Sequence, residues 1–239
     1  EAPVYLIEAN KEAIDKAKSA LDTAVTGAQS KLVDTKDQAK QEVKTSNDNK
    51  AWQDNAAVAN ATDALQNLID SETATKTDID NAIASLKSAE QAADNKLADV
   101  TATAKSALGK TAPVSGEKGV VDAAKDLQTL LESGTATETQ IADATKKLTD
   151  TVSAETTTRG KAVNDAASDV VPANVQDVKT VQDLQDKLQD ALANAAADKG
   201  TTQVIKDAQQ ALDDAVKQAQ SDLADVKNTA MSDMTNVPV

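Results

Sequence analysis

Apolar residues follow a helical spacing along the last quarter of the chain. They fall at Ile205, Ala208, Leu212, Ala215, Ala219, Leu223, Val226, Ala230 and Met234. Because residues three and four apart lie on one face of an α-helix, this spacing predicts a helix of about 34 residues with one buried stripe. A stripe sustained over about four heptads is typical of helices that pack in bundles or coiled coils.

The same stripe recurs three more times, at intervals of 62 to 65 residues. The copies are Ile14, Ala17, Leu21, Leu32, Ala39 and Val43; Ile79, Ala82, Leu86, Leu97, Ala104 and Leu108; and Ile141, Ala144, Leu148, Arg159, Ala166 and Val170. Two segments agree almost letter for letter, LADVTATAKSAL at 97–108 and LADVKNTAMSDM at 223–234. The interval indicates a helical repeat with four long helices. The third is the least regular, since Glu155 and Arg159 occupy stripe positions, and we expect it to bend or repack there.

Polar residues mark where the long helices begin. Thr75-Lys-Thr-Asp78 and Thr137-Glu-Thr-Gln140 have the spacing of capping boxes, in which the first side chain accepts from a free first-turn amide and the fourth reaches back. When the repeat copies are aligned, Thr201 falls at the same position as Thr75 and Thr137, and Asn10 falls there in the first copy. We therefore interpret these residues as helix starts and not as a ligand motif.

Shorter amphipathic segments lie between the long ones, at 59–70, 122–133 and 181–196. The loops SNDNKAWQDN, TAPVSGEKG and VPANVQDVK precede them, and Pro113 and Pro172 follow the ends of long helices, where proline cannot continue the ladder. One column of the repeat just before the short helices holds Trp52, Val114 and Val178. We expect each of these three side chains to close the end of a bundle.

The two helix lengths predict how the helices assemble. At 1.5 Å per residue a short helix of about 16 residues covers only about half of a long neighbour. The end of one long helix, the short helix and the start of the next long helix can therefore form a three-helix bundle, so that each long helix serves two bundles. The predicted fold is all-α, an elongated tandem array of three-helix bundles that share long continuous helices, as in a spectrin-like rod. The bundles are expected at 26–92, 93–154 and 155–218, with 1–25 as the N-terminal half of a long helix from a truncated repeat and 219–239 as the end of the last one.

Composition excludes much chemistry. The 239 residues include no Cys, no His and no Phe, which rules out a Ser-His triad, a thiol nucleophile and an ordinary zinc site. A net charge of −14 with one Trp and one Tyr disfavours nucleic-acid binding, which needs basic grooves and stacking platforms. No apolar run approaches the roughly 18–20 residues of a membrane span, so no membrane insertion is expected.

Acidic pairs are the remaining candidates for chemistry. They are Asp78 with Asp80, Asp183 with Asp186, and Asp213 with Asp214. None has the spacing of a calcium-binding loop, and a thin helical array offers little burial to raise the pKa of one carboxylate. SGEKG at 115–119 has two glycines but not the spacing of a phosphate-binding loop. We interpret the pairs as solvated helix faces and favourable first-turn charges, and predict no catalytic, cofactor-binding or metal site, no cofactor and no enzymatic activity.

Three segments resemble FIVAR modules of Gram-positive surface proteins, which carry the pattern A-x-x-L…AT-x-x-E/D-V/I-x-x-A…L. They are WQDNAAVANATDALQNLIDSETATKTDIDNAIASL (52–86), VVDAAKDLQTLLESGTATETQIADATKKL (120–148) and VQDLQDKLQDALANAAADKGTTQVIKDAQQAL (181–212). The third departs by an insertion and lacks the AT start. The resemblance implies a secreted adhesin or matrix-binding protein of the Gram-positive cell wall, with the modules forming its extended stalk.

Two functions follow as hypotheses. The first is a structural stalk or spacer that projects a binding domain from the cell wall, with neighbouring repeats of the same chain as its partners and a monomeric state. The alternative is a helical binding module, in which an exposed helix face recognises a host or matrix protein or a component of the wall. A binding module would expose an apolar or aromatic cluster, and the sequence offers Tyr5, Leu6 and Ile7, which we attribute to the truncated bundle.

Overall fold

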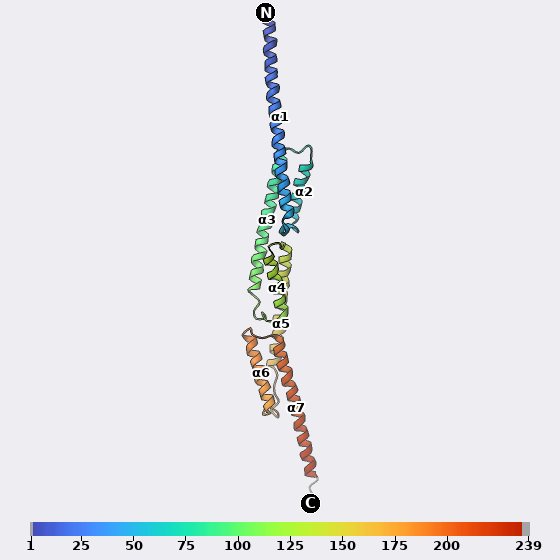
Figure 1. Cartoon of the computed structure of the whole chain (residues 1–239). Coiled ribbons are helices and arrows are strands. Elements are labelled where there is room, and N and C mark those ends of the chain that lie inside the picture. The colour runs from blue at the N-terminus through green and yellow to red at the C-terminus, as the bar shows by residue number, and fades with distance from the viewer. Residues whose placement is uncertain (1, 236–239) are drawn as a thin grey trace. The chain divides into compact units, whose positions relative to one another are not determined.

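The computed structural model describes the backbone of residues 2–235 and the side chains of residues 8–235. Within this range the protein is all-helical, as predicted, with seven α-helices, one short 3-10 helix and no strand (Figure 1). The α-helices are α1 (Ala2–Asp48), α2 (Ala56–Asp70), α3 (Lys76–Leu108), α4 (Lys118–Ser133), α5 (Glu138–Ala167), α6 (Lys179–Ala196) and α7 (Thr202–Thr235), and the 3-10 helix is Lys50–Trp52.

Long and short helices alternate as the sequence predicts. Helices α3, α5 and α7 have 33, 30 and 34 residues, whereas α2, α4 and α6 have 15, 16 and 18. The prediction of a helix start at Asn10 is wrong, because α1 begins before it and runs for 47 residues. The residues on both sides of Asn10 (Glu8, Ala9, Lys11 and Glu12) favour helix, so a single asparagine does not interrupt it.

The chain divides into two compact units. Unit 1 contains α1, α2, the part of α3 up to Thr101, and the segment Ser133–Gln140. Unit 2 contains the remainder of α3 from Ala102, helix α4 up to Glu132, α5 from Ile141, and the helices α6 and α7.

Three helices share the core of unit 1. Its buried residues are Ala39 and Val43 of α1; Val58, Leu65 and Ile69 of α2; Ala74; and Ile79, Ile83, Leu86 and Ala93 of α3. Helix α2 packs against α1, and α3 lies beside them in Figure 1. Of the predicted stripe positions, Ala39, Val43, Ile79 and Leu86 lie in this core, whereas Val58, Ile69 and Ile83 join it from positions outside the predicted stripes.

Unit 2 contains a second core with the same plan. Its members are Ala162 and Ala166 of α5; Val175; Val181, Leu188, Ala191 and Ala195 of α6; and Ile205, Leu212 and Ala219 of α7. Helix α6 packs against α7. Unit 2 also buries Ala104 of α3, Val120 and Leu127 of α4, and Ile141 and Leu148 of α5.

Trp52, Val114 and Val178 were each expected to close the end of a bundle. The structure places the first two side chains inward, but not the third. Val114 is fully buried, and Trp52 packs against the core of unit 1. Val178, in contrast, is 39% exposed, and Val175 is buried in its place with 1% exposed. Two successive turns place them so, since the amide of Val175 donates to Pro172 and that of Val178 donates to Val175. The third loop is therefore three residues out of the predicted register.

The irregular third copy of the stripe remains helical. Helix α5 is continuous through Glu155 and Arg159, and it carries the Arg159 side chain into the interior. Of the two expected outcomes, bending or repacking, the structure thus shows a repacked position at Arg159.

Stripe residues near the two ends of the chain are exposed. Ile14 and Leu21 of α1 and Val226 and Met234 of α7 face solvent, although the corresponding positions of α3 and α5 include fully buried residues such as Leu86. Among the described residues, therefore, no packing partner covers these stripe positions. Tyr5, Leu6 and Ile7, which the sequence singles out as an apolar cluster, lie outside the described side chains.

Candidate functional site

The two predicted capping boxes are confirmed. At the start of α3, the amide and hydroxyl of Thr75 donate to Asp78 Oδ2 at 2.9 and 2.7 Å, and the Asp78 amide donates to Thr75 Oγ1 at 3.2 Å. At the start of α5, the Thr137 amide donates to Gln140 Oε1 at 3.0 Å, and the Gln140 amide donates to Thr137 Oγ1 at 3.3 Å. The hydrogen bonds from Thr75 hold the pKa of the exposed Asp78 carboxyl below its ordinary value. These threonines therefore stabilise helix starts.

The start of α7 uses an acceptor from a distant part of the sequence. The helix begins directly after Thr201, as predicted, but the amide and hydroxyl of Thr202 both donate to Glu117 Oε1, each at 2.6 Å. Glu117 lies in the loop before α4, 85 residues from Thr202. A carboxylate at this place satisfies a free first-turn amide and interacts favourably with the positive end of the helix dipole.

Arg159 balances the charge of this buried carboxylate. The Arg159 residue is 4% exposed and Glu117 is 8% exposed. Arg159 Nη1 lies 3.7 Å from Glu117 Oε1, which makes an ion pair, and its hydrogen bonds go to the carbonyls of Gly200 (3.2 Å) and Ala195 (3.1 Å). A buried charge is costly unless it is paired and hydrogen-bonded, and here both charges are. We call Glu117, Arg159 and Thr202 the Glu117 network.

The loop before α7 is shaped around the same network. Gly200 has φ +76°, a conformation that glycine adopts without steric cost, and its carbonyl is the acceptor for Arg159. Asp198 also has a positive φ, of 55°, and its Oδ2 accepts from the Ser115 hydroxyl at 3.0 Å. Two side-chain contacts, Ser115 to Asp198 and Glu117 to Thr202, therefore join this loop to the loop before α4.

Sequence reasoning missed Glu117 as a functional residue of the fold. Its segment SGEKG is correctly interpreted as a loop, but the burial of the glutamate depends on residues far along the chain. The available signal was Arg159, a basic residue in a column that holds leucine in the other copies, which implies a buried acidic partner.

Residues far along the chain also affect the pKa of a carboxyl in unit 1. Asp54 lies in the loop before α2, and hydrogen bonding with the side chains of Thr137 and Thr139 and with the Thr139 backbone lowers the pKa of its carboxyl. Burial raises the pKa of the Asp54 carboxyl, but these hydrogen bonds outweigh burial and lower the pKa below its ordinary value.

Unit 1 also contains a partly buried carboxyl that carries an electrostatic cost. Burial raises the pKa of Glu90 above its ordinary value, and the nearby Glu42 and Asp94 raise it further, against the effects of Ser46 and Lys87. Glu42 pairs with Lys87 at 2.8 Å, and Asp94 accepts from Trp52 Nε1 at 2.8 Å, while Glu90 Oε1 is buried without a hydrogen bond. A raised pKa can indicate a proton-transfer site, but here it reflects crowding of acidic groups where α1 faces α3.

Replacing Glu90 by glutamine is expected to stabilise unit 1 at pH 7, by roughly 0.5 kcal/mol, because it removes the like-charge contacts with Glu42 and Asp94. The charged form of Glu90 is disfavoured in the folded state, so the cost exists at neutral pH and disappears as pH falls below the ordinary value of 4.5. Urea unfolding followed by circular dichroism at pH 7 and pH 4 measures both effects. Glu72→Gln, at an exposed position, is the control, and a Glu90→Gln gain that persisted at pH 4 would contradict the explanation.

The acidic pairs that the sequence singles out lie on helix faces, where several members have partners one turn away. Asp80 pairs with Lys76, Asp183 with Lys179, and Asp214 accepts from Gln210. Each of these contacts joins residues four apart on one helix, which contributes a few tenths of a kcal/mol. Within the described residues, no group of three or more acidic side chains is arranged to hold a metal ion.

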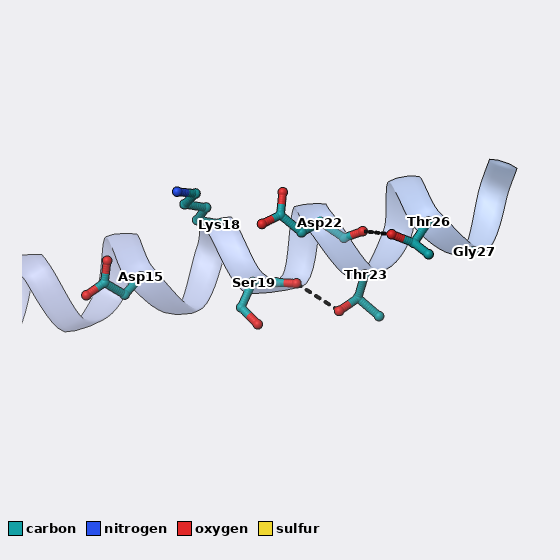
Figure 2. Close-up of a pocket in the computed structure, with 7 residues that line it drawn as sticks. All are labelled: Asp15, Lys18, Ser19, Asp22, Thr23, Thr26 and Gly27. Atoms are coloured by element: carbon teal, nitrogen blue, oxygen red, sulfur yellow. Dashed lines mark hydrogen bonds between the residues drawn. The ribbon is translucent and has the colours of Figure 1, made fainter.

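A hollow of about 650 Å³ lies along α1 (Figure 2). It is lined by Asp15, Lys18, Ser19, Asp22, Thr23, Thr26 and Gly27. Figure 2 shows these residues along one helix, with the hydroxyls of Thr23 and Thr26 donating to the backbone carbonyls of Ser19 and Asp22 at 2.8 Å. A surface formed by one helix has no opposing wall, so it does not enclose a ligand.

Comparison of the chain with protein-family models, curated proteins and solved structures found no match. Among the helices that the structure describes, none is both long and apolar enough to cross a membrane. Fold and contacts define an all-helical protein in which the two buried charged residues of the described chain, Glu117 and Arg159, support a helix start.

Proposed function

We propose that the protein is a non-enzymatic structural spacer, a stalk of tandem three-helix bundles that holds a binding domain away from a bacterial cell wall. The observation that carries this proposal is the double use of long helices. Helix α5 buries Ile141 and Leu148 near its start, and near its end it contributes Ala162 and Ala166 to the core shared with α6 and α7. Helix α3 likewise buries Leu86 in the core of unit 1 and Ala104 further along.

Helices used in this way favour a quasi-one-dimensional array. Helix α3 of 33 residues is about 50 Å long and α2 of 15 residues about 23 Å, so a short helix covers about half of its long neighbour. Successive bundles over 26–92, 93–154 and 155–218 would then each add roughly 27 Å of length. A stalk gains length in this way without any change in its cross-section.

The resemblance of residues 52–86, 120–148 and 181–212 to FIVAR modules supports the cellular setting of the proposal. It favours a secreted protein of the Gram-positive cell wall, with neighbouring repeats of the same chain as partners. The acidic surface, with a net charge of −14, favours solubility of such an array over self-association.

Small-angle X-ray scattering of the full chain tests the spacer. A tandem array of shared helices is expected to have a maximum dimension of about 110 Å or more, since the helix rise alone sets that length. A compact chain of 239 residues would instead have a radius of gyration of about 18 Å. A radius near that value would overturn the proposed stalk.

A binding module is the second candidate, favoured by the exposed apolar stripe of α1, which includes Ile14, Leu21 and Val25. Under this hypothesis, Ile14→Gln with Leu21→Gln would abolish binding of the chain to immobilised peptidoglycan or to purified extracellular-matrix proteins. Exposed polar positions on the same helix, such as Lys18→Gln, serve as the control. Binding by neither the wild type nor the control would exclude these ligands and leave the spacer as the function.

A further inference from the structure

Glu117 takes part in the start of two different helices. Its backbone carbonyl accepts from the Val121 amide at 2.9 Å, so it is the residue from which the first turn of α4 begins. Its side chain accepts from the amide and the hydroxyl of Thr202 at the start of α7, each at 2.6 Å. The first amides of a helix have no acceptor within that helix, so such a contact from outside stabilises the start. One residue therefore serves α4 with its main chain and α7 with its side chain.

The residues that precede the other two short helices behave differently. Asn55 stands 62 positions before Glu117 and precedes α2, and its side chain accepts from the amides of Ala57 and Val58 of that same helix at 3.1 and 3.2 Å. Val178 precedes α6, and its side chain makes no capping hydrogen bond. Of these three residues, Glu117 is therefore the one whose side chain serves a different helix from its main chain.

The exception at Glu117 coincides with the exception at Arg159. Three copies of the repeat hold leucine where α5 holds Arg159; they are Leu32, Leu97 and Leu223. Arg159 Nη1 lies 3.7 Å from Glu117 Oε1, and the Arg159 guanidinium donates to the carbonyls of Ala195 at the end of α6 and Gly200 in the loop before α7. The buried charge pair thus occurs in the same copy in which the capping side chain is turned toward a distant helix.

Helices α4 and α7 meet through their loops. The core shared by α5, α6 and α7 contains no described residue of α4. The loops before α4 and α7 nevertheless lie together within unit 2, since the Ser115 hydroxyl donates to Asp198 Oδ2 at 3.0 Å, and a Cβ added at Gly116 would lie 3.6 Å from the Gly200 carbonyl oxygen. The Glu117 side chain crosses this loop contact to reach the first turn of α7.

We propose that Glu117 is a shared cap that couples the opening of α4 to the opening of α7, with Arg159 holding its carboxylate in place. When the first turn of α4 opens, the main chain of Glu117 is released, and its carboxylate no longer holds Thr202. When the first turn of α7 opens, the carboxylate loses both donors of Thr202 and stays buried with Arg159 alone. Two helix starts 85 residues apart therefore open together. The coupling lies within unit 2 and goes beyond the role of the chain as a spacer.

The first copy of the repeat supplies the residues that undo the coupling. Glu117→Asn with Arg159→Leu introduces the residues that stand at Asn55 and Leu97. The asparagine side chain is one methylene shorter than glutamate and can accept from the first amides of α4, as Asn55 does in α2. The leucine leaves no buried charge unpaired, so the double variant is expected to fold. It keeps a cap for α4 and removes the cap of α7.

Hydrogen–deuterium exchange of the full chain, resolved by mass spectrometry, tests the shared cap. In the Glu117→Asn, Arg159→Leu variant, exchange of residues 201–206 is expected to be about five- to tenfold faster, the loss typical of a helix cap, while that of residues 119–122 keeps its rate. Glu117→Gln with Arg159→Leu is the matched control, because glutamine has the reach of glutamate and its amide oxygen can still accept from Thr202. Equal acceleration of residues 201–206 in both double variants, or none in either, would overturn the proposal.

A third substitution distinguishes coupling from a local cap. Lys118→Gly weakens the first turn of α4 at an exposed position, because glycine is unfavourable in a helix. In the otherwise unchanged chain it is expected to accelerate exchange roughly threefold both in residues 119–122 and in residues 201–206. With Glu117→Asn and Arg159→Leu also present, only residues 119–122 are expected to respond. A response of residues 201–206 that is equal in the two backgrounds, or absent from both, would overturn the coupling. The maximum dimension by scattering tests the spacer separately, because these substitutions leave the helix lengths unchanged.

Discussion

Replacing Arg159 by alanine is expected to destabilise unit 2 by about 3–5 kcal/mol, the cost typical of removing one partner from a buried charge pair. The substitution leaves the Glu117 carboxylate in the interior with no positive charge beside it. It also removes the donor that the carbonyls of Gly200 and Ala195 use. Urea unfolding followed by circular dichroism measures the loss, and Lys161→Ala, at an exposed position of the same helix, is expected to change stability by less than about 0.5 kcal/mol.

A double variant separates the charge from the shape of the site. Arg159→Leu restores the residue that occupies this column in the other three copies, and Glu117→Gln removes the charge that would otherwise be left unpaired. Because an apolar replacement of a buried ion pair is often neutral or stabilising, the double variant is expected to recover most of the stability that Arg159→Ala loses. A loss below about 1 kcal/mol for Arg159→Ala would show that the buried pair contributes as little as an exposed one.

Leu65→Ala is expected to destabilise unit 1 by about 2–5 kcal/mol, because it removes a fully buried side chain and leaves a cavity in a core shared by three helices. The matched control is Leu21→Ala, which makes the same chemical change at a stripe residue that is 63% exposed. The control is expected to shift stability by no more than about 0.5 kcal/mol.

The comparison of the two leucines also tests the exposure of the α1 stripe. Equal losses for Leu65→Ala and Leu21→Ala in urea unfolding would mean that Leu21 is covered in solution. Repeating the measurement at several protein concentrations would then show whether a second copy of the chain covers it, since stability that depends on association rises with concentration.

Local patterns in the sequence predicted the helices and several of their buried positions. The stripe positions Ile79, Leu86, Ile205 and Leu212 are buried because a helical face is set by residues three and four apart, which the sequence shows directly. Thr75 and Thr137 start helices as predicted, because a capping box lies within four residues. Elements whose cause lies within one or two helical turns could therefore be identified from the sequence.

Features that depend on distant segments could not be predicted. Nothing near Glu117 shows that a helix start 85 residues later will donate to it. Val175 replaces Val178 in the interior because two turns in the third loop change its register, and a column of aligned residues cannot show such a shift. Arg159 was partly predictable. A charged residue at a stripe position that holds leucine in the other copies indicates a repacked site, but it does not identify the residue with which Arg159 pairs.

Trp52 gives the protein a built-in optical probe. It is the only tryptophan in the chain, it packs against the core of unit 1, and its indole nitrogen donates to Asp94 of α3. Its fluorescence therefore reports on unit 1, whereas circular dichroism averages over all the helices. Recording both signals through one denaturation would separate the opening of unit 1 from that of unit 2 in the unlabelled, unsubstituted chain.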